Sequence, residues 1–180
     1  MATGHRRLTR SSGQGVAHLR LVPLPVDVAR RMLAGSPEPE ATSRWHSEYP
    51  LAASLDAIAK AMAAHQAMTG AADEPPAWWI HQIVVDGVVV GDIGFHGPPG
   101  PDRVVEIGYS VVPAWRGHGV ATRACDLILQ QAWRDGAEIV IAEADHDNVA
   151  SQAVLMSNGF RRRTGLIATG VFMIKRPEVR

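Results

Sequence analysis

The stretch Arg103–Ala121, RVVEIGYSVVPAWRGHGVA, constrains the fold of this chain more than any other. Residues 104–112 are rich in β-branched and aromatic side chains, which favour a buried strand. Pro113 ends that strand, because proline cannot donate to a sheet ladder. Gly117 and Gly119 then precede a long apolar-periodic run that predicts a helix. The first N–H groups of such a helix lack partners and attract anions, so a phosphate-bearing ligand is predicted here.

Two common phosphate-binding motifs do not fit this stretch. A P-loop needs a lysine after its second glycine, and Val120 stands there. The Rossmann fingerprint needs a third glycine at a fixed spacing and glycines that follow the strand directly, and neither condition is met. A tight turn that needs backbone freedom is the plainer interpretation of the glycines.

Three segments, taken in order, resemble the GNAT superfamily of acyl-CoA-dependent N-acetyltransferases. Residues 116–121, RGHGVA, are similar to that family's pyrophosphate loop. Residues 148–151, NVAS, leading to Gly159-Phe160, resemble its second motif, and residues 106–109, EIGY, precede the loop. The closer similarity is to the branch that includes ribosomal-protein N-terminal acetyltransferases.

The resemblance implies an α/β (mixed α+β) fold in a single GNAT-type domain. We expect a central, mostly antiparallel mixed sheet with a splayed central strand pair, flanked by helices. The domain is predicted to span residues 17–180 after a loose tail at residues 1–16.

The remaining segments fit this architecture. Asp86-Gly87 predicts a hairpin between strands at 78–85 and 88–95, which together with 104–112 form a meander. A strand is expected at 18–22, helices at 27–33 and 55–68, a strand at 138–142, a helix at 148–158 and closing strands within 161–175. Ser54 is placed to cap the helix at 55–68, and Gly159 to end the helix before it.

Composition narrows the class of protein. The formal net charge is zero, so no polyanion partner is indicated, and a nucleic-acid arm at Arg6, Arg7 and Arg10 is the weaker interpretation of the tail. Cys125 is the single cysteine, which predicts a reducing compartment and a small core residue. No segment has the length of a membrane span and no secretory signal is visible, so a cytoplasmic protein is expected.

The resemblance implies acetyl-CoA as co-substrate, and no metal is expected. Asp145-His146-Asp147 lacks further ligands at a suitable spacing for a metal site. Main-chain groups of Tyr109 through Val112 would pair with the pantetheine arm, with the Ser110 or Val111 N–H aimed at the thioester oxygen. Arg116 either adds charge or is simply solvated, and Asn148 either binds pantetheine or only caps its helix. The complete set of predicted cofactor-binding residues is Tyr109, Ser110, Val111, Val112, Arg116, Gly117, His118, Gly119, Val120, Ala121, Asn148 and Ser151.

The predicted catalytic residues are Glu106 and Ser110. Glu106 matches the position of a general base in several family members, and partial desolvation among apolar neighbours would raise its pKa. The alternative is that Glu106 pairs with an arginine across the sheet. Leu155 occupies the position that often carries a tyrosine acid in the family, so Ser110, His146 or a water would have to protonate the thiolate, or no acid is needed.

Acceptor contacts are predicted for Trp45, Asp92, Asp145 and His146. The carboxylates of Asp92 and Asp145 would favour a cationic amine. The acceptor is expected to be a primary amine. A small molecule such as an antibiotic, amino acid or polyamine is slightly favoured over a protein N-terminus. A non-catalytic acyl-CoA-binding regulatory module is the alternative, and a nucleotide-binding protein a third. A homodimer through an edge strand near Phe172 is possible by analogy.

Overall fold

The computed structural model of the chain describes residues 18–36, 44–69, 73–163 and 170–177. The predicted strand–turn–helix unit is present at its centre. Strand β5 (Val104–Val111) is followed by the short 3-10 helix η1 (Pro113–Trp115) and by helix α3 (Val120–Arg134). The glycine loop therefore enters a helix of full length, as its sequence predicts.

Seven strands form one continuous path in the sheet, in the order β1-β3-β4-β5-β6-β8-β7. The predicted meander consists of β3 (Ile80–Val85), β4 (Val88–Phe95) and β5. Its first hairpin turns at Asp86 and Gly87, whose φ angles of 49° and 79° suit a tight two-residue turn. Strand β1 (Leu19–Pro23) pairs with β3 at one edge. The two-residue β2 (Arg44–Trp45), which the sequence did not indicate, lies parallel to β4.

The second half of the sheet begins where β5 pairs with β6 (Ile139–Ala144) in parallel. This pairing covers only Val104–Glu106 against Ile139–Ile141, although both strands continue beyond it. The predicted splayed pair and the mixed α/β fold are thus confirmed. Strands β8 (Gly170–Lys175) and β7 (Arg161–Arg163) complete the sheet in antiparallel order.

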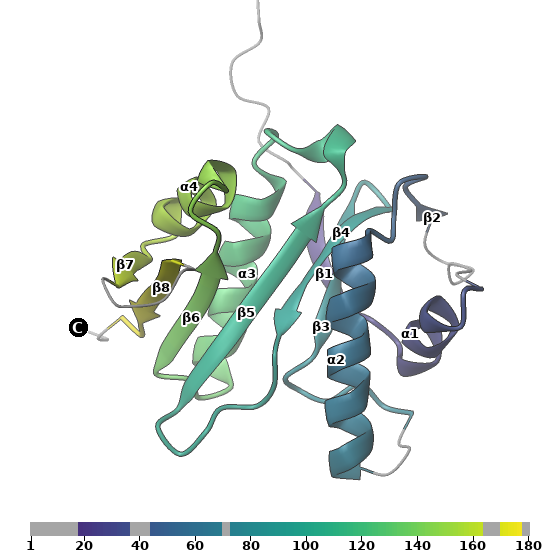
Figure 1. Cartoon of the computed structure of the whole chain (residues 1–180), viewed down its shortest axis with the longest axis horizontal. Helices are drawn as coiled ribbons and strands as arrows, with labels where there is room; N and C mark the ends of the chain where they lie inside the picture. The colour runs from purple at the N-terminus through teal and green to yellow at the C-terminus, as the bar shows by residue number, and fades with distance from the viewer. Residues whose placement is uncertain (1–17, 37–43, 70–72, 164–169, 178–180) are drawn as a thin grey trace, which may run out of the picture.

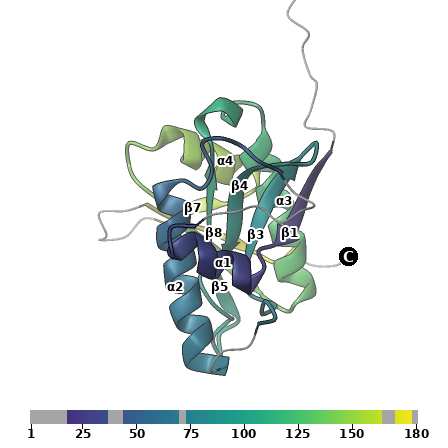
Figure 2. The ribbon, with the colours of Figure 1, turned by 90° about the vertical axis from the view of Figure 1, so that its right-hand side faces the viewer.

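Helices cover both faces of the sheet, as Figures 1 and 2 show. Helices α1 (Val26–Leu33) and α2 (Ala52–Thr69) lie on one face, and α3 lies on the other. Helix α4 (Val149–Ser157) follows β6 and packs beside α3. Gly159, with a φ of 85°, ends α4 in the predicted left-handed conformation.

The core follows from this layering, because alternate strand residues point to opposite faces. Ile83, Ile93 and Ile107 in the strands and Ile58 and Ile128 in the helices are each fully buried. Cys125 is also fully buried within α3, as predicted, and burial raises the pKa of its thiol to about 12. A thiol held neutral in this way is a packing residue rather than a nucleophile.

Two predictions about these elements are wrong, and a third concerns residues outside the described ranges. Ser54 is not a helix cap, because α2 already begins at Ala52 and Ser54 is fully buried within its first turn. Phe172 is not on an edge strand: β8 lies between β6 and β7, and Phe172 is only 1% exposed. The predicted tail at residues 1–16 lies outside the described residues. Among the residues that are described, no helix has the length and apolar character needed to cross a membrane.

Candidate active site

The opening between β5 and β6 exposes main-chain groups on one side of β5. The Glu106 carbonyl accepts from the His96 N–H and the Val112 N–H donates to the Val90 carbonyl, each at 2.9 Å, so both residues face β4. Because hydrogen-bonding direction alternates along a strand, Gly108 and Ser110 also face β4, whereas Tyr109 and Val111 face the opening. The main chain of Tyr109 and the Val111 N–H therefore point in the direction that the sequence prediction requires. The prediction is wrong for the main-chain groups of Ser110 and Val112, which the sheet ladder already uses.

The glycine loop after β5 adopts conformations that other residues rarely take. Gly117 and Gly119 have φ angles of 75° and 79°, and a Cβ added to either would meet no atom within 4 Å. Glycine is thus needed here for its backbone conformation, not for space. No side chain caps the start of α3, so its first-turn N–H groups remain available to an anion, and Val120 anchors the turn in the core.

A broad groove runs from this loop along α3 to α4. It is lined at the loop end by His118, Gly119, Thr122 and Arg123, and at the far end by Trp133 and Asn158. Arg116 does not point freely into solvent, because its Nε donates to the Val111 carbonyl at 2.9 Å. That bond ties the loop to the end of β5.

The N-terminus of α4 faces the same opening. Asn148 Oδ1 accepts from the Ser151 N–H at 3.0 Å, so Asn148 is the helix cap. The Tyr109 hydroxyl crosses from β5 to α4, lying 2.7 Å from Ser151 Oγ and 3.2 Å from the Ser151 carbonyl oxygen, to which it donates. Burial raises the pKa of Tyr109 to about 12. Leu155 is fully buried and supplies no acid from α4, whereas the Tyr109 hydroxyl reaches α4 from β5 at Ser151, one helical turn before Leu155.

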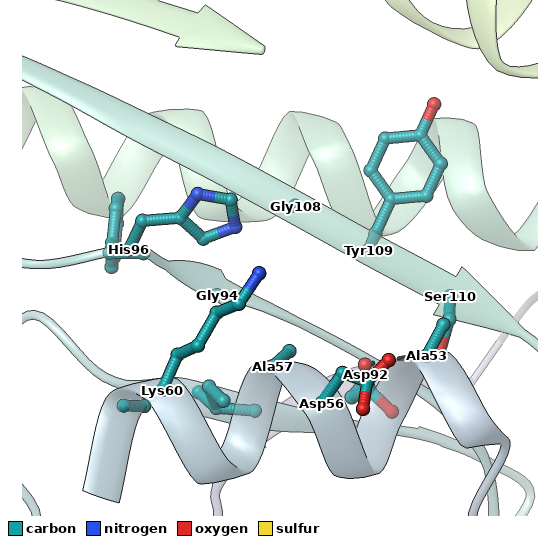
Figure 3. Close-up of a pocket in the computed structure, with 13 residues that line it drawn as sticks. Ala53, Asp56, Ala57, Lys60, Asp92, Gly94, His96, Gly108, Tyr109 and Ser110 are labelled. Carbon is teal, nitrogen blue, oxygen red and sulfur yellow. Dashed lines mark hydrogen bonds between the residues drawn. The ribbon is translucent and has the colours of Figure 1, made fainter. Parts of the chain in front are cut away.

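A cavity of about 370 Å³ lies on the other face of β5, between that strand, β4 and α2. Figure 3 shows the residues around it. Its floor is the cross-strand pair of Gly94 and Gly108, which carry no side chains to fill the space. Tyr109 and Ser110 also line it, so β5 borders both the cavity and the opening toward β6.

A buried carboxylate lies at one end of the cavity. Asp92 is 4% exposed, and its Oδ1 accepts from Ser110 Oγ at 3.1 Å, while Ser54 Oγ lies 2.9 Å from Ser110 Oγ. Asp92 Oδ2 has no hydrogen-bond partner among the described residues, and the nearby buried hydroxyl of Tyr49 makes no hydrogen bond of normal geometry. Burial raises the pKa of Asp92 to about 6, although the hydroxyls of Ser54, Ser110 and Tyr49 offset part of this effect.

The second carboxylate, Glu106, has the opposite electrostatic setting. Its Oε1 lies 3.0 Å from His96 Nδ1, and this hydrogen bond lowers the pKa of Glu106 below its ordinary value. The expected rise of that pKa is therefore wrong, and the cross-sheet partner is a histidine rather than an arginine. The ring of His96, not the Glu106 carboxylate, lines the cavity, with Nε2 above Gly108.

Helix α2 contributes two further charges to the cavity wall. Asp56 and Lys60 both line the cavity, one helical turn apart. Neither forms an ion pair with any described residue, and Lys60 acts on Glu106 only as a more distant charge that lowers the Glu106 pKa. In Figure 3 the Lys60 side chain rises toward His96 and Gly108, away from Asp92.

Of the four predicted acceptor residues, only Asp92 lines the cavity. Trp45 packs edge-on against Tyr49, with ring centroids 5.3 Å apart, and Tyr49 neighbours Asp92. Asp145 and His146 are exposed in the turn before α4, where His146 Nδ1 contacts Arg162. The predicted acidic cluster of Asp92 and Asp145 is therefore not assembled. No group of His, Cys, Asp and Glu within the described ranges is arranged to hold a metal ion.

Sequence reasoning missed Ser54, Lys60 and His96 as cavity or network residues. Lys60 and Asp56 share a helix face, which is the only local signal that connects them. His96 follows a strand directly, but its approach to Glu106 depends on the turn at 97–103 that folds β5 back onto β4. Neither contact can be derived without the register of the sheet.

A splayed parallel strand pair, an uncapped helix start behind a glycine loop and a polar cavity on one shared strand define an acyl-CoA-type transferase architecture. Comparison with known proteins agrees. The family model described as acetyltransferase (GNAT) domain matches residues 18–161. The chain therefore belongs to the GNAT acetyltransferase family, whose members are N-acetyltransferases that use acetyl-CoA and need no metal. The resemblance noted in the sequence is confirmed.

Individual relatives are distant. An uncharacterized N-acetyltransferase, YjdG of Bacillus subtilis (strain 168), is 32% identical over 73 residues. That match spans 40% of this chain and only 44% of YjdG.

Solved structures share the fold over most of their length. The microcin C7 self-immunity acetyltransferase MccE, in complex with acetyl-CoA and AMP, matches with a TM-score of 0.60 and 16% identity, covering 89% of this chain and 93% of that chain. RimJ of Mycobacterium smegmatis, in complex with CoA-disulfide, has a TM-score of 0.59 and 23% identity, and the match covers 89% of this chain and 83% of RimJ. RimL, a ribosomal L7/L12 α-N-protein acetyltransferase in complex with coenzyme A, matches with a TM-score of 0.61 and 14% identity, and the match covers 88% of this chain and 94% of RimL.

Proposed function

We propose that this chain transfers the acetyl group of acetyl-CoA to a primary amine that enters the cavity beneath α2. The observation that carries the proposal is the double role of β5, which borders the opening toward β6 on one edge and the cavity on one face. A thioester in the opening and an amine in the cavity would meet at Tyr109 and Ser110. The amine nitrogen attacks the thioester carbon, the carbon–sulfur bond breaks, and the leaving thiolate takes up a proton.

Acetyl-CoA is assigned to the opening and the groove that continues from it. Its pyrophosphate would lie on the N–H groups of residues 117–121, where the helix dipole favours negative charge. The pantetheine arm would pair with the main-chain groups of Tyr109 and with the Val111 N–H, as an added strand does, since Arg116 already engages the Val111 carbonyl. The Val111 N–H is then the donor placed to stabilise the thioester oxyanion. Ser151 and the cap residue Asn148 would border the arm at α4.

Asp92 is the better candidate for the general base than Glu106. A base must reach the amine and must hold a proton well enough to compete for it. Asp92 lines the cavity, has one unpartnered oxygen and has a pKa of about 6. Glu106 does not line the cavity and its pKa is lowered by His96, so we assign it to positioning His96. Ser110 would orient the Asp92 carboxylate through their hydrogen bond rather than react itself.

Tyr109 is assigned as the proton donor to the leaving thiolate. A raised pKa keeps its hydroxyl protonated at neutral pH, and the hydroxyl lies in the opening that the thioester would occupy. This assignment supplies the acid that Leu155 cannot. It also weakens the motive for the alternative, a non-catalytic acyl-CoA-binding module.

A small-molecule acceptor remains favoured over a protein N-terminus. The support is the position of the cavity, which lies beneath α2 and is walled by its side chains on one side. The fold is shared with RimL, which acts on a ribosomal protein, so a peptide acceptor is the alternative to be tested.

The deciding experiment is release of free CoA thiol from acetyl-CoA, followed with a thiol reagent across a panel of primary amines and short peptides. Amine-dependent release, with the acetylated amine identified by mass spectrometry, is expected. A chain that binds acetyl-CoA but releases thiol with none of these acceptors would instead be the regulatory module.

A further inference from the structure

The cavity presents opposite charges at its two ends. Ser54 contacts Ser110 near the start of α2, while Lys60, six residues and about 9 Å farther along the helix, acts electrostatically on Glu106. Asp92 therefore lies at the first end, and Lys60 with His96 at the second. Asp56 lies between Ser54 and Lys60 on the same helix and adds negative charge toward the first end (Figure 3).

Both end charges lack a full partner within the described part of the chain. Asp92 Oδ2 is buried and accepts no hydrogen bond of normal geometry, and the nearby Tyr49 hydroxyl only partly offsets the effect of burial on the Asp92 pKa. Lys60 forms no ion pair, although Asp56 stands one turn away, at a spacing where such pairs form readily. Glu106 forms no ion pair with Lys60, and Glu106 Oε1 instead contacts His96 Nδ1. An unpaired buried oxygen is costly, so a ligand that supplies its donor is favoured.

These two features together describe the acceptor. We infer that the preferred acceptor is a primary amine that also carries an anionic group, with the amine bound toward Asp92 and the anion toward Lys60 and His96. This inference rests on the proposed acetyl transfer and narrows its substrate class. A diamine or polyamine is disfavoured, because its second cation would face Lys60.

The shared chemistry is available in two sources: a free amino acid, and a peptide N-terminus followed by an acidic side chain. A cavity of about 370 Å³ holds an amino acid fully but only the first residues of a peptide. We therefore commit to the free amino acid, and the peptide is one arm of the test.

The test uses amines that differ only in the group at the far end. The four-carbon set is 4-aminobutanoate, 4-aminobutanamide and 1,4-diaminobutane, with matching sets of two to six carbons and the dipeptide pair Ala-Glu-amide and Ala-Gln-amide. We expect the best anionic member to exceed its amide in kcat/KM by about tenfold, the factor of a partly exposed ion pair, and the diamine to rank last. An acidic dipeptide that outranks every free amino acid would overturn the commitment to the smaller acceptor.

Charge variants at one position assign the effect to Lys60. Lys60→Met should raise the KM of the anionic amine by about five- to tenfold and leave the amide unchanged, and Lys60→Glu should move the diamine to the top of the ranking. Lys175, the other lysine of the chain, is exposed at the end of β8 and does not line the cavity, so Lys175→Met is the matched control. Thermal shifts of the CoA-bound protein with each amine give a second readout that does not need turnover.

The outcomes distinguish failure of acetyl transfer from failure of the acceptor assignment. If no amine or peptide releases CoA thiol, acetyl transfer itself is wrong. If neutral or dicationic amines are acetylated as well as anionic ones, or if Lys60→Met affects all acceptors equally, acetyl transfer stands and the inference about the acceptor is overturned.

Discussion

Asp92 and Glu106 are carboxylates on neighbouring strands, and their surroundings give them opposite proton affinities. Glu106 stands among apolar residues in the sequence, which suggested desolvation and a raised pKa. In the fold, the His96 imidazole outweighs that desolvation and lowers the Glu106 pKa. Asp92 stands in the run Gly91-Asp92-Ile93-Gly94, and of the two carboxylates it is the one that the fold buries. Hydrophobic neighbours along a strand do not decide burial, because they alternate between the two faces.

Exchanging each carboxylate for its amide distinguishes their roles. Asp92→Asn should lower kcat by about a hundredfold or more, the usual contribution of a general base, while Glu106→Gln should cost less and act mainly through His96. In the wild type, kcat/KM should rise with pH up to about 6, where Asp92 of the free enzyme becomes ionised, and this limb should vanish in Asp92→Asn. Equal losses in both variants without a change in the pH profile would count against Asp92 as the base.

The same residue affects stability in a defined direction. The folded state holds the Asp92 proton more tightly than the unfolded chain does, since its pKa is about 6 rather than 3.8. The free energy of unfolding should therefore fall by about 3 kcal/mol as the pH rises through this interval. Denaturant unfolding between pH 4 and 8 should show Asp92→Asn gaining on the wild type as the pH rises; a constant difference between the two would contradict the burial argument.

Ser54 tunes Asp92 from the neighbouring helix. Its hydroxyl lowers the Asp92 pKa, so Ser54→Ala should move the acid limb of the kcat/KM profile to higher pH. Loss of the buried hydrogen bond should also cost about 1 kcal/mol of stability, measured by urea unfolding. Gln66→Ala, at an exposed position farther along α2, is the control for helix propensity. A Ser54→Ala profile that coincides with the wild type would remove Ser54 from the network.

At the scale of elements, local signals predicted structure well where a turn or helix end is encoded by a few adjacent residues. The Asp86-Gly87 hairpin and the Gly159 helix end are of this kind. The start of α2 was placed too late because Ser54 has the chemistry of a cap, whereas in the fold its hydroxyl bonds to Ser110. Such a tertiary contact, 56 residues away along the chain, leaves no trace in local propensity.

The loop that begins α3 gives a prediction about conformation. Gly119→Val forces a β-branched residue to a φ of 79° and should cost about 1 to 2 kcal/mol of stability while raising the KM for acetyl-CoA. Gly35→Val is the matched control, because Gly35 has a φ of 75°, also has open space around it and lies after α1, away from the loop. Both variants should lose similar stability, but only Gly119→Val should weaken acetyl-CoA binding. An unchanged KM in Gly119→Val would remove the loop from the cofactor site.

The Tyr109 hydroxyl connects β5 with α4 across the opening, so its removal tests the proposed acid. Tyr109→Phe should lower kcat by about tenfold or more and change the KM for acetyl-CoA by less than about twofold. Ser151→Ala keeps the Tyr109 hydroxyl and its bond to the Ser151 carbonyl, so it should retain most of kcat. A rise in KM with kcat preserved would instead make Tyr109 a contact of the pantetheine arm only.

At the scale of the whole molecule, the cavity is built from α2, β4, β5, the first residue of β3 and the residue after β4, which come together only through the sheet register. The family motifs therefore cover only the proposed cofactor half of the site, where loop and helix are adjacent in sequence. Of the acceptor half, only Asp92 was predicted from the sequence, and Lys60 and His96 were missed, because these three residues come from separate segments. The exposed arginines of β7, the edge strand at one end of the sheet, discourage edge-to-edge pairing there.

Strands β5 and β6 stop pairing after Glu106 and Ile141, so few ladder hydrogen bonds join the two halves of the sheet there. A ligand bound in this opening should therefore stabilise the whole fold. A ligand present at about 100 times its Kd adds about 2.7 kcal/mol to the free energy of unfolding. Acetyl-CoA and CoA should each produce this gain in chemical denaturation, whereas ATP, which has phosphates but no pantetheine arm to pair with Tyr109 and Val111, should produce much less. Equal stabilisation by ATP would indicate that only the anion site at α3 binds, and the protein would then be a nucleotide-binding member of this fold.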